Sequence, residues 1–382
     1  MPRSEPDPEA TGGGPFAGGL LTIDLDAIAA NWRSLAGRLA GGARCAAVVK
    51  ADAYGLGMAE VAPALAAAGC DIFFVAQLDE GLALRRILPG AAIAVLAAPV
   101  AGAEGEYRTS RLLPVLNSLA DLDAWRRQAQ GGEAPPAMLH VDTGMARLGL
   151  SGPEFDRLAA EPERLRGVPL AGVMSHLACA DEPEHPLNAE QLAAFRAAIA
   201  RLPVRAPASL ANSSGIFLGA DYHFDLARPG IALYGGNPVP GRPNPMRPVL
   251  RLQGRILQIR EVDRPLSVGY GAAATVRPPA RLATVSVGYG DGYLRSLSGR
   301  GHAWAGGVRV PVIGRVSMDL VVFDITGVPA EAARAGAFVD LIGPGQSVDE
   351  LAAEAGTISY EILTSLGSRY RRRHVGGAPP AP

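Results

Sequence analysis

The stretch CAAVVKADAYGLG (residues 45–57) decides how this chain is interpreted. Its first part, CAAVV, is a short apolar run typical of a buried strand, and Lys50 stands at the end of that run. An unpaired ammonium is costly in such a place, and an arginine cannot replace a lysine where a deprotonatable amine is needed. The position therefore predicts an amine with a chemical role, and the glycines that follow it allow a tight turn.

Lys50 is also the single lysine of the chain. The sequence has 36 lysines and arginines in total, and only the residue at position 50 is a lysine. A composition rich in Ala, Gly, Arg and Pro explains why lysine is scarce, but it does not explain why the remaining one ends a buried strand. Because a buried amine is readily neutral and nucleophilic toward carbonyl groups, we favour a functional role for Lys50 over chance retention.

Composition narrows the class of protein. A chain of 382 residues suggests two domains of about 100–200 residues each, and 48% hydrophobic content allows a large core. The net charge of −1 argues against a nucleic-acid partner, and no apolar run reaches the ~18 residues of a membrane span. The acidic, Pro- and Gly-rich start shows no secretory signal, and three cysteines without paired spacing suit a reducing cytoplasm. We therefore expect a cytoplasmic enzyme.

Short apolar runs alternate with amphipathic segments through the first two thirds of the chain. The predicted strands are 45–49, 71–76, 92–97, 112–117, 137–142, 170–175, 207–212 and a last short one near 224–234. The predicted helices are 26–40, 58–69, 79–88, 119–128, 154–165 and 189–202. Asp26, and Ser151 with Glu154, are the expected N-terminal caps. Eight alternations predict an α/β fold, a (β/α)8 barrel over residues 19–245. The alternative is an open doubly wound sheet, for which no Gly-rich dinucleotide fingerprint follows the first strand.

The pattern changes after NPVPGRPNPMRP (237–248), which is typical of a linker. Residues 246–375 predict a mainly β domain, with helices only at 331–337 and near 349–366. Residues 1–18 and 376–382 are expected to be flexible segments. The basic run RYRRRH (369–374) is expected to be a solvated terminal segment.

Eight blocks of the sequence, in this order, resemble the alanine racemase family. They are VVKADAYGLG (48–57), HVDTGMARLG (140–149), MSHLACADE (174–182), LANSSG (210–215), ARPGIALYG (227–235), SVGYGAAATV (267–276), VSVGYGDGYLR (285–295) and IGRVSMDL (313–320). The resemblance covers about residues 20–375. It implies a barrel that binds pyridoxal 5′-phosphate (PLP), followed by a β domain, in a homodimer whose active sites each combine the barrel of one chain with the β domain of the other.

The resemblance also implies the roles of the catalytic residues. Lys50 would bind PLP covalently and act as one of two bases, and Tyr270 of the partner subunit would be the second base. A phenol with an ordinary pKa near ~10 needs help to act as a base, and the resemblance implies that His176 and Arg228 are hydrogen-bonded to it in a chain. Arg228 would also face the pyridine nitrogen of PLP. Because a guanidinium does not give up a proton, the ring would stay unprotonated, which favours proton exchange at Cα over decarboxylation or transamination.

Further residues are implied for binding. Ser213, Gly230 and Ile231, with Tyr54, match the phosphate contacts of the family, the glycine allowing close approach of the backbone. Arg147 matches the arginine near the phenolic oxygen and the substrate carboxylate. Met318 matches a backbone N–H donor to that carboxylate, contributed by the partner. Tyr289 matches a residue of the entryway, with Arg295 and Asp319 near it.

Two positions depart from the family's pattern. Many members carry a carbamylated lysine that orients the arginine matching Arg147, whereas this chain has His140 there and no second lysine. A tyrosine that lines the substrate pocket in many members aligns with Ser368, which predicts a wider pocket. His185, His223 and His302 show no metal-ligand spacing.

The leading hypothesis is racemisation of alanine by two bases, which would supply D-alanine for peptidoglycan or serve catabolism of one enantiomer. The alternatives are a racemase of broader specificity, for serine or a basic amino acid, motivated by Ser368, and a decarboxylase, which Arg228 disfavours. A non-catalytic PLP carrier is the alternative from another class, although single-barrel carriers lack the second domain and therefore the partner's tyrosine.

Overall fold

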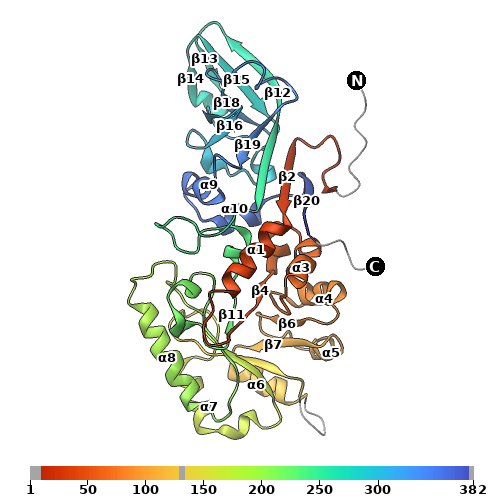
Figure 1. Cartoon of the computed structure of the whole chain (residues 1–382), viewed down its shortest axis with the longest axis vertical. Coiled ribbons are helices and arrows are strands. Elements are labelled where there is room, and N and C mark those ends of the chain that lie inside the picture. Colours follow the sequence, from red (N-terminus) through yellow and green to blue (C-terminus); the bar gives the residue numbers. More distant parts are fainter. Residues whose placement is uncertain (1–9, 129–133, 378–382) are drawn as a thin grey trace.

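The predicted barrel is present, and Lys50 lies at the end of its first strand. A computed structural model describes residues 10–128 and 134–377 (Figure 1), so residues 1–9 and 378–382 of the expected flexible ends lie outside the described part. Of the described strands, seven form one parallel sheet in the order β10-β9-β8-β7-β6-β5-β4. These strands are β4 (Ala47–Val48), β5 (Ile72–Val75), β6 (Ala92–Val95), β7 (Leu112–Leu116), β8 (Ala137–His140), β9 (Leu170–Met174) and β10 (Ala208–Ser209).

A two-stranded ladder closes the ring between the two edges of this sheet. Strand β11 (Leu226–Ala227) pairs in parallel with β3 (Arg44–Cys45), which leads directly into β4. The backbone N–H of Asp225 donates to the carbonyl of Ala208 on β10 at 3.0 Å. All eight predicted strands therefore exist, and the eighth is short and lies near 224–234, as predicted.

Helices connect the barrel strands and cover their outer side (Figure 1). They are α1 (Leu25–Ala36), α3 (Met58–Ala67), α4 (Leu78–Ile87), α5 (Glu104–Thr109), α6 (Leu119–Arg126), α7 (Gly152–Ala160) and α8 (Leu187–Arg201). The short segment α2 (Lys50–Gly55) instead follows β4 as a turn at the cavity described below. The predicted cap of α7 is confirmed, because Glu154 Oε2 accepts from the Ser151 N–H at 3.0 Å. The predicted cap Asp26 is wrong: it lies inside the first turn of α1, and Asp24 accepts from the Ala27 N–H at 2.8 Å instead.

The second domain is mainly β, as predicted. Its large sheet has the order β1-β20-β2-β12-β19-β16-β17, with β15 paired to β12 and to β18, and β13 and β14 form a separate hairpin. The new elements are β1 (Ala10–Gly12), β2 (Gly19–Asp24), β12 (Leu250–Val262), β13 (Leu266–Val268), β14 (Ala274–Val276), β15 (Ala280–Val285), β16 (His302–Ala305), β17 (Val308–Pro311), β18 (Val321–Asp324), β19 (Phe338–Ile342), α9 (Val348–Ala355), α10 (Ser359–Ser365) and β20 (Arg371–Val375).

The helix expected at 331–337 is absent from the described structure, which has turns there. Pro329 precedes the segment and Gly336 has a φ of 85°, so too few residues remain between them to nucleate a helix.

The beginning of the chain belongs to the sheet of the second domain. Strand β2 pairs antiparallel with β12 and parallel with β20, and β1 pairs antiparallel with β20. This differs from the expected division, in which residues 1–18 are flexible and the barrel begins at residue 19. Both ends of the described chain therefore lie in one sheet beside α1 and α3 (Figure 1).

The expectation of a solvated terminal segment at 369–374 is also wrong. Strand β20 lies between β1 and β2. Two of its side chains, Arg372 and His374, reach carbonyl groups of Gly55 and Leu56, in the segment that follows Lys50. No helix within the described residues has both the length and the apolar character needed to cross a membrane.

Candidate active site

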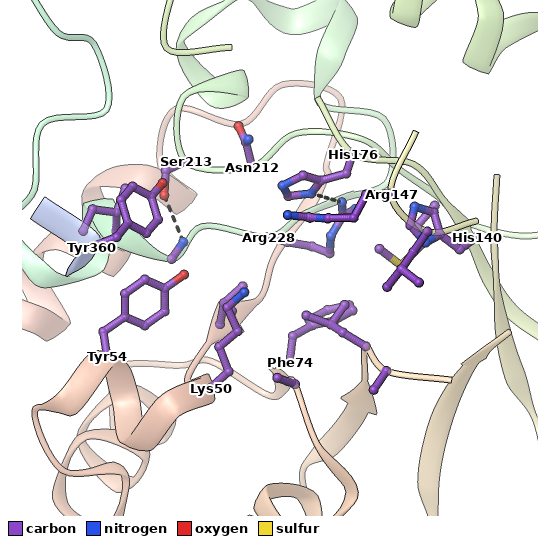
Figure 2. Close-up of a pocket in the computed structure, with 18 of the residues that line it drawn as sticks. Lys50, Tyr54, Phe74, His140, Arg147, His176, Asn212, Ser213, Arg228 and Tyr360 are labelled. Atoms are coloured by element: carbon purple, nitrogen blue, oxygen red, sulfur yellow. Dashed lines mark hydrogen bonds between the residues drawn. The ribbon is translucent and has the colours of Figure 1, made fainter. Parts of the chain in front are cut away.

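A cavity of about 410 Å³ opens at the carboxyl ends of the barrel strands, where barrel enzymes place their active sites. The structure brings together there most of the residues that the sequence predicts for the site: Lys50, Tyr54, Arg147, His176, Ser213, Arg228, Gly230 and Ile231 (Figure 2). Three of the described lining residues are lysine or arginine, namely Lys50, Arg147 and Arg228, and none of the described lining residues is an aspartate or a glutamate. The cavity therefore favours an anionic ligand.

Lys50 connects the end of β4 to α2 and points into this cavity (Figure 2). Burial lowers the pKa of its ammonium group, the charge of Arg147 lowers it further, and Glu80 opposes the shift. The neutral amine is thus more accessible near neutral pH than in water, as covalent chemistry at a carbonyl carbon requires.

The turn that follows Lys50 has an unusual backbone. Its residues Ala51–Tyr54 have φ values of 51°, 53°, 53° and 58°, which is the left-handed region. Each such residue other than glycine costs about 1–2 kcal/mol relative to the right-handed form. The turn places the ring of Tyr54 over the cavity, between Tyr234 at 4.7 Å and Tyr360 at 5.8 Å between ring centroids.

Hydroxyl groups and backbone N–H groups gather at one end of the cavity. Ser213 Oγ accepts from the N–H of Gly230 at 2.9 Å (Figure 2), and from that of Ala232 at 3.2 Å. A Cβ atom at Gly230 would collide with Tyr54 Oη, so only glycine allows the ring and the backbone to approach this closely. Because its oxygen accepts both of these bonds, the Ser213 hydroxyl keeps its own proton to donate, and such a donor fits an oxygen of a phosphate group.

Arg228 forms the buried cationic side of the cavity. It donates to Ser209 Oγ and, at 2.6 Å, to the carbonyl of Ser175. The amine that donates to Ser175, Nη2, also lies 3.4 Å from His176 Nδ1 (Figure 2). Burial lowers the pKa of Arg228 to about 10, so the guanidinium stays charged at neutral pH, although these partners are all neutral. A buried cation without an acidic partner fits a ligand that supplies an acceptor.

His176 is neutral in this environment. Burial lowers its pKa well below the ordinary value, and the charge of Arg228 adds to the effect. Since its Nδ1 faces the Arg228 guanidinium, which can only donate, the proton of the neutral ring is on Nε2. The ring therefore presents a hydrogen-bond donor on its other side.

His140, at the end of β8, is held by Asn117. The side-chain amide of Asn117 donates to the carbonyls of Leu96 and Val115, both at 3.1 Å, so its oxygen faces His140 Nδ1 at 2.7 Å. This arrangement assigns the proton to Nδ1 and leaves Nε2 as an acceptor. Burial lowers the pKa of His140 to about 4, so the ring is neutral.

One residue of the cavity was missed by the sequence analysis, and one prediction there is wrong. Tyr360, in the first turn of α10, lines the cavity next to Tyr54 (Figure 2). Ser368, which was expected to take the place of a pocket tyrosine, is exposed between α10 and β20 and is not among the lining residues. The pocket has its tyrosine, so the expectation of a wider pocket loses its basis. The signal was present in the same segment, SYEILTSLGS, eight residues earlier.

Three predicted residues lie outside this cavity, in the β domain. Tyr270 begins a short turn between β13 and β14, at the end of that domain remote from the barrel (Figure 1), and is 72% exposed. Met318 and Tyr289 are 55% and 41% exposed and belong to neighbouring loops, since the Gly290 N–H donates to the Met318 carbonyl at 2.8 Å.

The two residues with weaker claims lie near these loops. Arg295 is exposed in the turn Arg295–Leu297, and Asp319 accepts a hydrogen bond of 2.6 Å from Arg369.

Comparison with known proteins identifies the family. The model of the alanine racemase N-terminal domain matches residues 23–238, and that of the C-terminal domain matches residues 249–374. An alanine racemase of Rhodospirillum rubrum is 59% identical, covering 94% of this chain and 96% of the relative. A catabolic alanine racemase of Mesorhizobium japonicum is 53% identical, covering 94% of each chain.

Solved structures agree with this match. The alanine racemase of Bartonella henselae with covalently bound pyridoxal phosphate has a TM-score of 0.90 and 42% identity, covering 94% of this chain and 100% of that one. The biosynthetic alanine racemase of Pseudomonas aeruginosa has a TM-score of 0.87 and 36% identity, with the same coverage. The chain therefore belongs to the alanine racemase family of PLP-dependent isomerases.

Proposed function

We propose that this alanine racemase interconverts L- and D-alanine with PLP attached to Lys50 and with Tyr270 of a second copy on the opposite face of the substrate. The observation that carries the proposal is Lys50 itself, a buried amine of lowered pKa in a cavity lined by cations and phosphate-binding groups. PLP, when bound, withdraws electrons from the substrate Cα and so makes its proton removable.

The residues of the cavity fit PLP. The Ser213 hydroxyl, the backbone N–H of Ile231 and Tyr54 Oη would hold the phosphate, since they converge at one end of the cavity. The Gly230 N–H would join them by turning from Ser213 Oγ, to which it now donates. Arg228 would donate to the pyridine nitrogen, because it is the buried donor that lacks an acidic partner. Arg147 would bind the substrate carboxylate.

Two bases on opposite faces explain exchange of configuration at Cα. The neutral amine of Lys50 removes or returns the proton on one face, and the phenol of the partner's Tyr270 does so on the other. His176 supports the second base, because its Nε2–H can donate to a phenolate oxygen and its Nδ1 is oriented by Arg228. Because Arg228 keeps its proton, it limits electron withdrawal by the ring and favours return of the Cα proton over loss of CO₂.

A homodimer completes the site. Tyr270, Met318 and Tyr289 lie on exposed loops of the β domain and are not among the residues that line the cavity of their own chain, which supports their contribution by a second copy. Met318 would donate its backbone N–H to the substrate carboxylate, and Tyr289 would border the entrance.

One similar protein is named a biosynthetic alanine racemase and another a catabolic one. The reaction could therefore serve either the synthesis of D-alanine or the breakdown of one enantiomer. We favour supply of D-alanine for peptidoglycan in the cytoplasm, where the three free cysteines would remain reduced.

Solvent deuterium exchange tests the proposal. The holoenzyme is incubated with L-alanine in deuterated water, and deuterium at Cα is followed together with optical rotation. The wild type should incorporate deuterium and lose optical activity, whereas Tyr270→Phe should lose racemisation by about 10²-fold or more, the size expected for a positioned acid–base group. PLP-loaded wild type that exchanges no deuterium would overturn the proposal.

A further inference from the structure

The segment Lys50–Gly55, which we call the Lys50 turn, carries two side chains of the cavity, Lys50 and Tyr54 (Figure 2). Four of its consecutive residues are left-handed, and none of the four is glycine. Such a backbone persists only where its surroundings hold it. Hydrogen bonds from outside the cavity are found at both ends of the turn.

Glu80 holds the beginning of the turn. Its Oε1 accepts from the N–H of Ala51, the residue after Lys50, at 2.6 Å. Its Oε2 accepts from the N–H groups of Ala76 at 2.7 Å and Gln77 at 3.0 Å, which follow β5. One carboxylate therefore ties the end of the strand that carries Lys50 to the end of the next barrel strand.

Arg372 holds the end of the turn from the β domain. One amine of its guanidinium donates to the carbonyl of Gly55, and the other donates to the carbonyl of Leu366 at 3.1 Å. His374, two residues further along β20, places Nε2 2.8 Å from the carbonyl of Leu56. Arg372 thus joins the Lys50 turn to the segment between α10 and β20, close to the helix that carries Tyr360.

We propose that Glu80 and Arg372 are positioning residues that hold the Lys50 turn in its left-handed form and so set where Lys50 and Tyr54 point. The inference rests on the proposed role of Lys50 as the cofactor lysine. It adds a second task for the β domain: besides presenting Tyr270 to another copy, it controls the cofactor-binding geometry of its own barrel.

The test uses holoenzymes of Glu80→Gln and Arg372→Met. Glutamine turns an amide NH₂ toward at least one of the three N–H donors, and methionine keeps an apolar stem but loses the donors. Asp79→Asn and Arg371→Met are matched controls. Asp79 is the exposed neighbouring acid, and no described hydrogen bond joins the Arg371 side chain to the turn. Two readouts are independent of turnover: equilibrium PLP retention on dialysis, and the visible circular dichroism of bound PLP, which reports its orientation.

Loss of a charge-assisted hydrogen bond should weaken PLP retention by about tenfold or more in both test variants and alter the circular dichroism per bound PLP. The controls should match the wild type within about twofold. A lowered melting temperature with unchanged retention and dichroism would show a merely structural role and overturn the proposal. Arg372→Lys, which keeps one charged donor, should give an intermediate effect and serves if Arg372→Met fails to fold.

A rescue experiment tests the backbone part of the proposal. Ala51 is exposed and has a φ of 51°, so Ala51→Gly removes the conformational penalty without removing a packed side chain. In the Arg372→Met background it should restore PLP retention by about threefold or more. No recovery would contradict the idea that Arg372 acts by holding a disfavoured backbone.

Borohydride reduction followed by peptide mapping separates this inference from the proposed function. PLP found elsewhere than on Lys50 in the wild type would defeat the proposed function itself. PLP found on Lys50, with unaltered retention and dichroism in both test variants, would defeat only the positioning role of Glu80 and Arg372.

Discussion

Burial, the charge of Arg228 and the neighbouring hydrogen-bond partners determine the protonation of the two histidine rings in the cavity. Arg228 stays charged, and its charge together with burial keeps His176 and His140 neutral. The hydrogen-bond partners then assign a different proton to each ring, Nε2 in His176 and Nδ1 in His140. The two histidines therefore face the active site as a donor and an acceptor, respectively.

The lowered pKa of His140 predicts acid sensitivity of the fold. Its folded-state pKa is about 4, below the ~6.5 of an unfolded histidine, so the unfolded chain takes up a proton first as the pH falls. The free energy of unfolding should thus decrease between pH ~6.5 and ~4, with up to about 3 kcal/mol from this residue.

Urea unfolding at fixed protein concentration, repeated across that window, measures the effect. His140→Gln removes the titrating ring, and its loss of stability over the window should be smaller than that of the wild type, while His176 still contributes in both proteins. Equal pH dependence in the two proteins would contradict the assignment of His140 as a buried neutral ring.

At the scale of elements, the alternation of apolar and amphipathic segments was sufficient to predict the barrel. The backbone conformation of the turn after Lys50, in contrast, depends on contacts with residues far away in the sequence. Within KADAY only Asp52 is of a type that readily takes a positive φ, which does not predict four left-handed residues in a row. The contacts of Glu80 and Arg372 with the two ends of the turn come from distant parts of the chain. The helix expected at 331–337 failed for a local reason, a proline and a glycine at its ends. The helix cap was predicted correctly where the capping-box motif was complete, at Ser151 and Glu154. The cap predicted at Asp26 lies two residues earlier, at Asp24.

Gly230→Ala tests the loop that would hold the phosphate. An added Cβ would collide with Tyr54 Oη, so either the ring or the loop must move. We expect a loss of about 1–3 kcal/mol in stability or in PLP binding, as for overpacking elsewhere. The melting temperature of the purified holoenzyme measures the loss of stability, and its PLP content measures the loss of binding.

Gly152→Ala is the matched control for that variant. A Cβ at Gly152 meets no atom within 4 Å, so this change should leave PLP content as in the wild type. If Gly230→Ala binds PLP as the control does, Tyr54 and Gly230 do not form the phosphate site.

For the whole molecule, sequence alone indicated the order of the two domains but not how they are joined. The pairing of β2 with β12 and β20, and the approach of β20 to the Lys50 turn, are contacts between residues far apart in the chain. No local sequence pattern predicts these contacts. For this reason RYRRRH was predicted to be a solvated segment, and Ser368 instead of Tyr360 was predicted at the position of the pocket tyrosine.

Hybrid dimers test the shared site. Lys50→Ala and Tyr270→Phe should each be inactive as homodimers, but a hybrid has one site that combines an intact Lys50 with an intact Tyr270. Random pairing of equal amounts makes about half of the dimers hybrid, and in the purified hybrid fraction about half of the sites should be active. Co-expression with two affinity tags, followed by racemisation assays on the doubly purified fraction, measures it. A hybrid as inactive as its parents would show that Tyr270 acts elsewhere.

Because Lys50 is the only lysine in the sequence, its chemical state can be measured directly by cleavage or labelling. An endoprotease that cuts after lysine has one target in this chain, the bond between Lys50 and Ala51, and would divide it into residues 1–50 and 51–382. A reagent that acylates amines meets a single side chain, besides the α-amino group. Each molecule therefore reports the state of the Lys50 amine through one cleavage or one mass increment, without mutagenesis and without a substrate.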